Sequence, residues 1–169
     1  MKLAIVTGAA QGIGRRTAEI FAVAGYALDL LDLQPCTATL ASIRAIGCDA
    51  ENFTGDISNE SVVEAAAEAI RLRWDRADVL VNNAGISSIA PAETVDVQTF
   101  RRVLEVNLVA PFLLARTFGK VMLQRRSGCI VNVASIAGLA GIAKPAGRKC
   151  ARTALSSTAR PGMAHTRPI

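Results

Sequence analysis

The chain has 169 residues, of which 51% are hydrophobic and 20% are charged. This size and composition suit one globular domain with a buried core. The formal charge is +5, but residues 1–105 carry 14 acidic and 9 basic side chains, whereas residues 106–169 carry 10 basic side chains and no acidic one. An overall basic surface typical of a nucleic-acid-binding domain is therefore not indicated.

Several other classes are excluded by the pattern of apolar residues and cysteines. No run of 18 or more apolar residues occurs, so we expect no transmembrane helix. The apolar stretch at the N-terminus ends at Thr7-Gly8, which is too short for an export signal, and we therefore expect a cytoplasmic protein. The four cysteines show no Cys-x-x-Cys spacing, so neither a metal site nor a disulfide framework is expected.

Strand-like and helix-like patterns alternate up to about residue 143, which predicts parallel strands joined by crossover helices. Strands are predicted at residues 3–6, 27–32, around Phe53, at 79–81 and at 129–133. Each intervening helix is predicted to turn one apolar stripe toward the sheet. The first helix ends at Gly25, and its stripe is Ile13, Ala18, Phe21 and Ala22. The third helix is capped by Ser58, with the stripe Val62, Ala66, Ile70 and Trp74, and the fourth is kinked by Pro111, with the stripe Phe100, Leu104, Leu108 and Phe112. The second helix, around residues 39–46, has the weakest pattern.

The periodic pattern stops after Ile142. Residues 144–169 consist largely of Ala, Arg, Pro, Gly, Ser and Thr, and such a segment buries too little apolar surface to offset the entropy of ordering. We therefore expect a domain at 1–143 and a basic tail at 144–169, which is either disordered or read out of frame from a GC-rich gene. A genuine variant with a functional basic tail is the alternative.

A glycine-rich segment lies between the first predicted strand and its helix. It reads Thr7-Gly8-Ala9-Ala10-Gln11-Gly12-Ile13-Gly14. Glycines at this point allow a tight turn and a close backbone approach, and the free N–H groups of the helix N-terminus attract a pyrophosphate. Because strand-to-helix turns also use glycine for packing, the placement after the first strand is what favours nucleotide binding.

An acidic residue at the end of the second predicted strand supports the same interpretation. Asp32 could accept hydrogen bonds from the ribose hydroxyls of an adenosine. Its charge would repel the additional phosphate of NADP, which favours NAD(H) over NADP(H), although Arg15 and Arg16 keep NADP(H) as the alternative. Asp29 lies in the same strand and could face either side of the sheet; we interpret it as structural.

Five motifs in unbroken order resemble those of the classical short-chain dehydrogenase/reductase family. They are Thr7-Gly8-x-x-x-Gly12-Ile13-Gly14, Gly55-Asp56-Ile57, Asn82-Asn83-Ala84-Gly85, Val106-Asn107-Leu108, and the segment from Ile130 to Gly138 that contains Ser135. The resemblance covers residues 1–143 and implies a Rossmann-like doubly wound α/β fold with a parallel sheet of strand order 3-2-1-4-5, truncated after the fifth strand. It also implies reversible hydride transfer between a nicotinamide and a carbonyl or secondary alcohol.

The resemblance also implies roles for individual residues. Gly8, Gln11, Gly12, Ile13 and Gly14 would surround the pyrophosphate. Asp56 and Ile57 would contact the adenine, and Asn83, Ala84 and Gly85 would line the cofactor channel. Asn107 would hold a water in a proton relay, and Ser135 would hydrogen-bond the substrate oxygen. The plain alternatives are a helix-entry Asp followed by a core Ile for Asp56 and Ile57, a strand-end turn for residues 83–85, and for Asn107 a side chain that caps the kink at Pro111.

The acid/base pair that the family uses is missing from this chain. The only tyrosine is Tyr26, and Lys144 and Lys149 have Ala140 and Pro145 four residues before them, so no Tyr-x-x-x-Lys exists. His165, the sole histidine, lies in the unpatterned tail, and we do not assign it a catalytic role. We therefore expect an inactive truncated oxidoreductase, or alternatively a non-enzymatic NAD-binding or interaction protein. The family's homo-oligomers depend in part on a helix that we do not recognise here.

Overall fold

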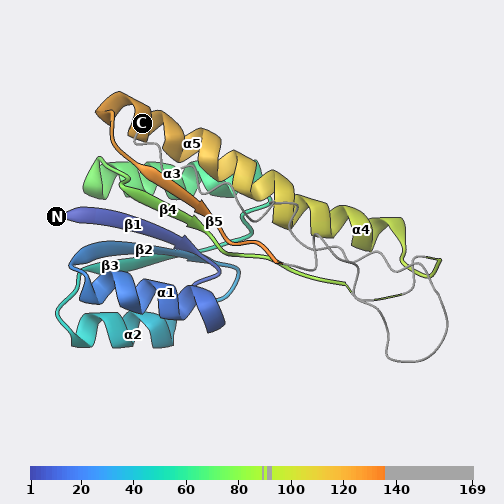
Figure 1. The fold of residues 1–169 in the computed structure, drawn as a ribbon, viewed down its shortest axis with the longest axis horizontal. Coiled ribbons are helices and arrows are strands. Elements are labelled where there is room, and N and C mark those ends of the chain that lie inside the picture. The colour runs from blue at the N-terminus through green and yellow to red at the C-terminus, as the bar shows by residue number, and fades with distance from the viewer. Residues whose placement is uncertain (89, 91–92, 136–169) are drawn as a thin grey trace.

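A five-stranded parallel sheet organises the part of the protein that the structure describes (Figure 1). The computed structural model describes residues 1–88, 90 and 93–135. Its five strands have the order β3-β2-β1-β4-β5, as the resemblance predicted, and every neighbouring pair is parallel. The strands are β1 (Lys2–Thr7), β2 (Tyr26–Asp32), β3 (Ala50–Thr54), β4 (Val79–Asn82) and β5 (Cys129–Asn132).

Helices cover both faces of this sheet. Figure 1 shows α1 and α2 on one face, with α3 and the long helical run of α4 and α5 on the other. The strand order runs from β1 to β3 in one direction and from β1 to β5 in the other. Because crossovers between parallel strands are right-handed, the two directions place their helices on opposite faces of the sheet. The helices are α1 (Gly12–Val23), α2 (Thr37–Ala45), α3 (Glu60–Trp74), α4 (Val97–Leu104), the π-helical turn η1 (Glu105–Val109) and α5 (Ala110–Arg125).

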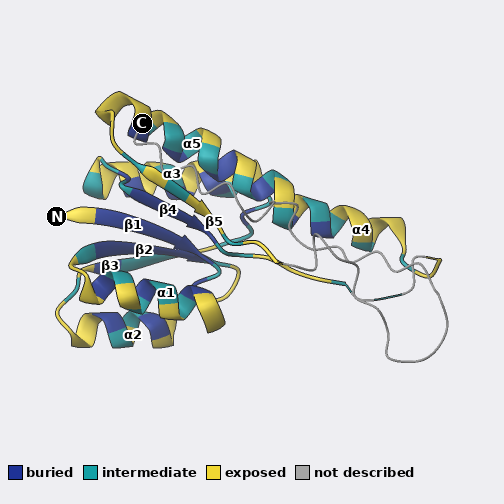
Figure 2. Ribbon diagram, viewed as in Figure 1, coloured by how far each residue is buried: buried dark blue, intermediate teal, exposed yellow. Residues whose placement is uncertain are grey.

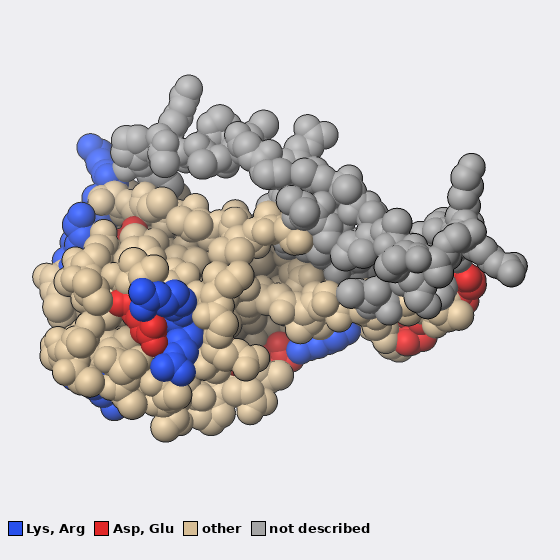
Figure 3. All heavy atoms as spheres, turned by 60° about the horizontal axis from the view of Figure 1, so that its bottom comes forward, with Lys and Arg blue, Asp and Glu red and all other residues tan. Residues whose placement is uncertain are grey.

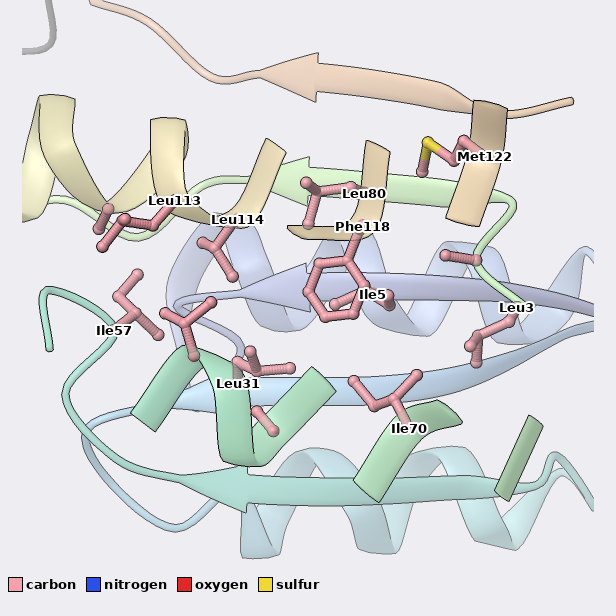
Figure 4. Close-up of a cluster of buried hydrophobic side chains, with 14 of the residues drawn as sticks. Leu3, Ile5, Leu31, Ile57, Ile70, Leu80, Leu113, Leu114, Phe118 and Met122 are labelled. Atoms are coloured by element: carbon pink, nitrogen blue, oxygen red, sulfur yellow. The ribbon is translucent and has the colours of Figure 1, made fainter. Parts of the chain in front are cut away.

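Two hydrophobic clusters, one on each face, hold the layers together. The central strands β1, β2 and β4 are buried, whereas the edge strand β5 and the outer helix faces are exposed (Figure 2). On the α3/α5 face, Phe118 of α5 lies over the sheet close to Leu80 and Ile5 (Figure 4). On the opposite face, small residues of α1 such as Ala18 and Ala22 pack with Leu28 and Leu30 of β2. Burial on both faces explains why the central strands are continuous apolar runs.

The buried side of the long helical run differs from the predicted one. Phe100, Leu108 and Phe112 are exposed by 39%, 48% and 62%, so the predicted apolar stripe is wrong. The buried residues are instead Val103, Val106, Ala110, Leu113, Leu114, Phe118 and Met122. The run has two apolar faces, and the sequence pattern does not show which one faces the sheet.

The run Val97–Arg125 is also long and apolar enough to cross a membrane. In the structure, however, Leu114 and Met122 are fully buried and belong to the cluster on the α3/α5 face of the sheet. A core helix of an α/β fold satisfies the same test of length and composition, and the packing of this helix against the sheet identifies it as one.

Two further local predictions need correction. Ile13 is 67% exposed, because α1 approaches the sheet through its smallest residues, Gly14, Ala18 and Ala22. Helix α3 is capped by Asn59, whose side chain accepts a hydrogen bond from the Ser61 N–H, and not by Ser58. At Pro111 the helical run continues from η1 into α5, with the proline in the first turn of α5, and the kink stays a prediction. The tail predicted at 144–169 lies outside the described residues.

Candidate functional site

A cavity of about 300 Å³ opens at the carboxyl ends of the strands. Open parallel sheets bind ligands at this edge, where the strand order reverses. Here the reversal falls between β1 and β4, and the cavity spans it. Its lining is Gly8, Gln11, Leu31, Asp32, Leu33, Gly55, Asp56, Ile57, Asn83, Ala84, Gly85, Ile86, Arg102 and Val106.

The glycine-rich turn that begins this lining depends on its glycines. Gly8 and Gly12 have φ values of 66° and 58°, in the left-handed region that other residues rarely adopt. A Cβ on Gly14 would lie 2.0 Å from the carbonyl oxygen of Gly8 and 2.5 Å from Nδ2 of Asn83. The third glycine therefore lets α1 start directly against the turn.

The turn is joined to the end of β4 by the side chains of Thr7 and Asn83. The Thr7 hydroxyl oxygen accepts from the backbone N–H groups of Asn83 at 3.0 Å and Ala84 at 2.9 Å, and the hydroxyl donates to the Val81 carbonyl at 3.3 Å. In return, Nδ2 of Asn83 donates to the Thr7 carbonyl at 2.9 Å. These bonds fix the two strand ends between which the sheet order reverses.

Asp32 lies at the end of β2 and faces the same cavity. One carboxylate oxygen accepts from the Ala10 N–H at 2.9 Å, and the other from the Gln34 N–H at 2.9 Å. A carboxylate has about four acceptor positions, so two remain for a ligand. Arg15 and Arg16, which favoured the alternative cofactor, both pair with Glu19 on α1 and do not line the cavity.

Asp56 follows β3 and belongs to a small polar cluster with Ser58 and Arg102. Its Oδ1 accepts from the Ser58 N–H at 3.0 Å and from the Ser58 hydroxyl at 2.7 Å. Arg102 of α4 lies 2.7 Å from Oδ2. Burial raises the pKa of Asp56, but the hydrogen bonds from Ser58 and Arg102 outweigh it, and the net shift of the pKa is downward. The carboxyl is therefore an acceptor over the whole neutral range.

Asn107 does not line the cavity but supports it. Its Oδ1 accepts from the backbone N–H of Ile86 at 2.9 Å, and its Nδ2 donates to the carbonyl of the same residue at 2.7 Å. Both polar atoms of the Asn107 side chain therefore bond to the backbone of Ile86 and not to the helix at Pro111, as the plain alternative would require. Asn107 lies in the π-helical turn η1. An α-helical hydrogen bond to the Asn107 carbonyl would come from residue 111, which is a proline and has no N–H, so the regular α-helical pattern is interrupted here.

The structure brings together most of the predicted cofactor-binding residues and leaves others outside the cavity. Gly8, Gln11, Asp32, Asp56, Ile57, Asn83, Ala84 and Gly85 line it, whereas Gly12, Ile13 and Gly14 lie in the adjoining turn and first turn of α1. Ser135 is exposed three residues beyond β5 and is not part of the lining. Sequence reasoning missed Arg102, because no motif in the sequence links it to Asp56, its distant partner.

Asp29, the competing acid of β2, faces α3 and not the cavity. It is 5% exposed, and burial raises its pKa to about 6, with the nearby indole of Trp74 and the charge of Arg73 opposing the rise. Among the described residues, neither Asp29 Oδ2 nor Trp74 Nε1 completes a hydrogen bond. We therefore interpret Asp29 as a structural residue whose charged form is disfavoured by burial.

A family model described as short chain dehydrogenase matches residues 2–164 of the chain. Curated relatives include the uncharacterized oxidoreductase YxjF of Bacillus subtilis, 37% identical over 84% of this chain and 56% of its own length. D-threitol dehydrogenase of Mycolicibacterium smegmatis is 38% identical over 79% of this chain and 52% of its own length. Levodione reductase of Leifsonia aquatica is 35% identical over 89% and 58%, respectively. The chain thus spans just over half the length of the curated relatives it matches.

Solved structures show the same likeness. A metagenomic short-chain oxidoreductase in complex with NADP superposes with a TM-score of 0.80 at 34% identity, covering 84% of this chain and 66% of that one. A crystal structure of levodione reductase gives a TM-score of 0.80 at 33% identity, covering 83% and 57%.

Proposed function

Because this chain belongs to the short-chain dehydrogenase family of oxidoreductases, we propose that its described part binds a nicotinamide dinucleotide and prefers NAD(H) to NADP(H). The observation that carries this proposal is the position of Asp32, which lies in one cavity with the glycine turn at Gly8 and with Asp56. The residues present fit the group: glycines allow a close approach of the backbone, and two carboxylates offer acceptors at two separated points.

Each part of the cavity has a distinct task in this proposal. The turn at Gly8–Gly14 and the N-terminus of α1 would hold the pyrophosphate. The two acceptor positions left on Asp32 would take the two ribose hydroxyls. Asp56 and Ile57 would hold the adenine, and residues 83–85 would border the nicotinamide half.

The preference for NAD(H) rests on charge. A 2′-phosphate would approach the carboxylate of Asp32, and like charges repel strongly in a partly enclosed site. Arg102 is the only cation among the described residues that line the cavity, and it is paired with Asp56. The NADP complex of one structural relative makes the preference of this chain worth measuring directly.

Binding titrations followed by NADH fluorescence test the proposal. The chain should bind NADH more tightly than NADPH, and Asp32→Ala should weaken NADH binding about tenfold or more, because hydrogen bonds to a charged acceptor are lost. The same substitution should reduce the ratio of the affinity for NADH to the affinity for NADPH. Glu64→Ala, which removes an exposed carboxylate on α3, is the matched control. A chain that binds neither nucleotide would overturn the proposal.

For catalysis, we propose that this chain itself transfers hydride poorly. A bound nicotinamide would supply the hydride donor or acceptor, but reaction at a carbonyl also needs a group that gives or takes the proton on oxygen. Ser135 and Asn107 are present, whereas the family's Tyr-x-x-x-Lys is missing from the sequence. The relatives named D-threitol dehydrogenase and levodione reductase support a small alcohol or ketone as the substrate class. We also propose a cytoplasmic location. Robust NAD-dependent oxidation of simple secondary alcohols would contradict the proposed inactivity.

The ten basic residues of 106–169, with no acidic residue among them, favour one alternative. In it the chain binds NAD without catalysis, and its basic end contacts acidic surfaces. Deletion of residues 144–169 separates the two, because only the alternative requires a salt-dependent interaction that the deletion abolishes.

A further inference from the structure

Arg102 occupies a position in the cavity that the assignments above do not explain. It comes from α4, the helix that continues through η1 to Asn107, and it reaches across to the residues that follow β3. Besides the contact with Asp56, its guanidinium donates to the Ser58 hydroxyl at 2.5 Å. The Ser58 hydroxyl in turn donates to Asp56. Asp56, Ser58 and Arg102 thus form a closed ring of three side chains.

This ring defines which acceptor position of Asp56 remains open. The Ser58 N–H and hydroxyl occupy Oδ1, and Arg102 occupies one position on Oδ2. Of about four acceptor positions on a carboxylate, one on Oδ2 is left. Without Arg102, Ser58 would still hold Oδ1, but Oδ2 would lose the one side chain that fixes its direction toward the cavity.

The open position on Oδ2 is an acceptor on the cavity wall. The amino group of adenine is a donor and can bond to this acceptor, whereas hypoxanthine has a carbonyl oxygen, itself an acceptor, at the same place on the ring. The guanidinium of Arg102 donates to Ser58 and Asp56, so its effect on the base passes through Asp56.

We propose that Arg102 is a positioning residue that holds Asp56 in the orientation that selects an adenine edge over a hypoxanthine edge. This inference rests on the proposed binding of a nicotinamide dinucleotide. It assigns the selectivity to an ion pair between α4 and the loop after β3, and not to Asp56 alone.

Removal of the ion pair between Arg102 and Asp56 should change the stability of the folded protein little. The side chains of Arg102 and Asp56 are 42% and 36% exposed, and ion pairs of this exposure contribute little to stability. Arg101 precedes Arg102 on the same helix and is exposed, so Arg101→Met is a control with the same change in charge and helix propensity.

The test compares the affinities of the chain for NADH and for its reduced hypoxanthine analogue, both measured by fluorescence titration. The unaltered chain should prefer NADH. Arg102→Met should weaken NADH binding about fivefold to tenfold, the range expected when a charge-assisted hydrogen bond is misaligned, and should leave the analogue nearly unaffected. Arg102→Lys should restore part of the preference, and Arg101→Met should preserve it.

The double variant Asp56→Asn/Arg102→Met completes the design. If Arg102 acts through Asp56, the double variant should lose no more preference than Asp56→Asn alone, because the two side chains act as one unit. Equal weakening of both nucleotides by Arg102→Met would overturn the inference and give Arg102 a general structural or electrostatic role. Failure of the unaltered chain to bind NADH would instead overturn the proposed function, and this inference with it.

Discussion

Gly14 illustrates at the level of one residue how closely the cofactor turn is packed. A Cβ at this position would meet a backbone oxygen at 2.0 Å, and backbone moves less readily than a side chain. Gly14→Ala should therefore destabilise the protein by about 1–3 kcal/mol, the usual cost of overpacking, and should weaken NADH binding. Urea denaturation and NADH titration measure the two effects.

Gly119 of α5 provides the matched control for this substitution. A Cβ there meets nothing within 4 Å, so Gly119→Ala should leave NADH binding unchanged and stabilise the helix by up to about 1 kcal/mol. If Gly14→Ala behaved like Gly119→Ala, the close approach of α1 to the glycine turn would be wrong.

Asp29 should make stability depend on pH in the direction opposite to the paired acids. Its pKa is about 6 in the folded protein and ordinarily 3.8, so the folded state binds the proton more tightly than the unfolded state. Protonation of Asp29 therefore stabilises the fold below about pH 4, and this contribution is lost as the pH rises through 6. By linkage the loss amounts to roughly 3 kcal/mol at neutral pH.

The measurement is a comparison of urea denaturation for the unaltered chain and for Asp29→Asn between pH 4 and pH 8. Asp56 and Asp78 have lowered pKa values and lose stability on acidification, so the difference between the two proteins isolates Asp29. The unaltered chain should gain stability relative to the variant as the pH falls. A difference that is constant with pH would contradict the burial of an ionisable Asp29.

At the scale of secondary structure elements, the single hydroxyl of Thr7 joins β1 to the end of β4. Thr7 is fully buried, and it satisfies two backbone N–H groups, those of Asn83 and Ala84. Thr7→Val keeps the shape but leaves the Ala84 N–H without an acceptor and the Asn83 N–H with the Val81 carbonyl alone, which should cost about 1–3 kcal/mol, the range for one unsatisfied buried group. Asn59→Ala, which removes the cap of α3, should cost only about 1 kcal/mol.

Chemical denaturation of both variants checks this prediction, and NADH titration adds a second readout. Thr7→Val should also weaken NADH binding, because Asn83 and Ala84 line the cavity, whereas Asn59→Ala should not. Equal stability losses in the two variants would show that the contact between β1 and β4 is weaker than the hydrogen bonds indicate.

The elements differ in how far the sequence predicts them, for physical reasons. The central strands are predictable because both faces are buried and the run is short and apolar. The side of the long helical run that faces the sheet is not predictable, since Phe100 and Phe112 lie on one apolar face and Leu114 and Phe118 on another. Arg102 escapes prediction because its partner Asp56 is distant in sequence, and only the folded chain brings the two together.

At the scale of the whole molecule, charge is distributed in two ways. On the face that Figure 3 shows, basic side chains of the described residues lie beside acidic ones, in agreement with ion pairs such as those of Arg73 with Asp49 and Glu51. Residues 1–143 carry 13 basic and 14 acidic side chains, and residues 144–169 add six basic side chains. The net charge of +5 therefore originates beyond residue 143.

This distribution predicts what deletion of residues 144–169 should do. Among the described residues, both hydrophobic clusters are built from residues up to 133 and the cavity lining ends at Val106, so we expect the shortened chain to keep its NADH affinity within about twofold. Its net charge changes from +5 to −1, and any weak, sequence-independent binding to duplex DNA should disappear, since such binding depends on phosphate neutralisation and falls steeply with salt. NADH titration and salt-dependent DNA binding of both forms are the measurements. Loss of NADH affinity on deletion would mean that residues beyond 143 complete the site, which would contradict the proposed domain boundary.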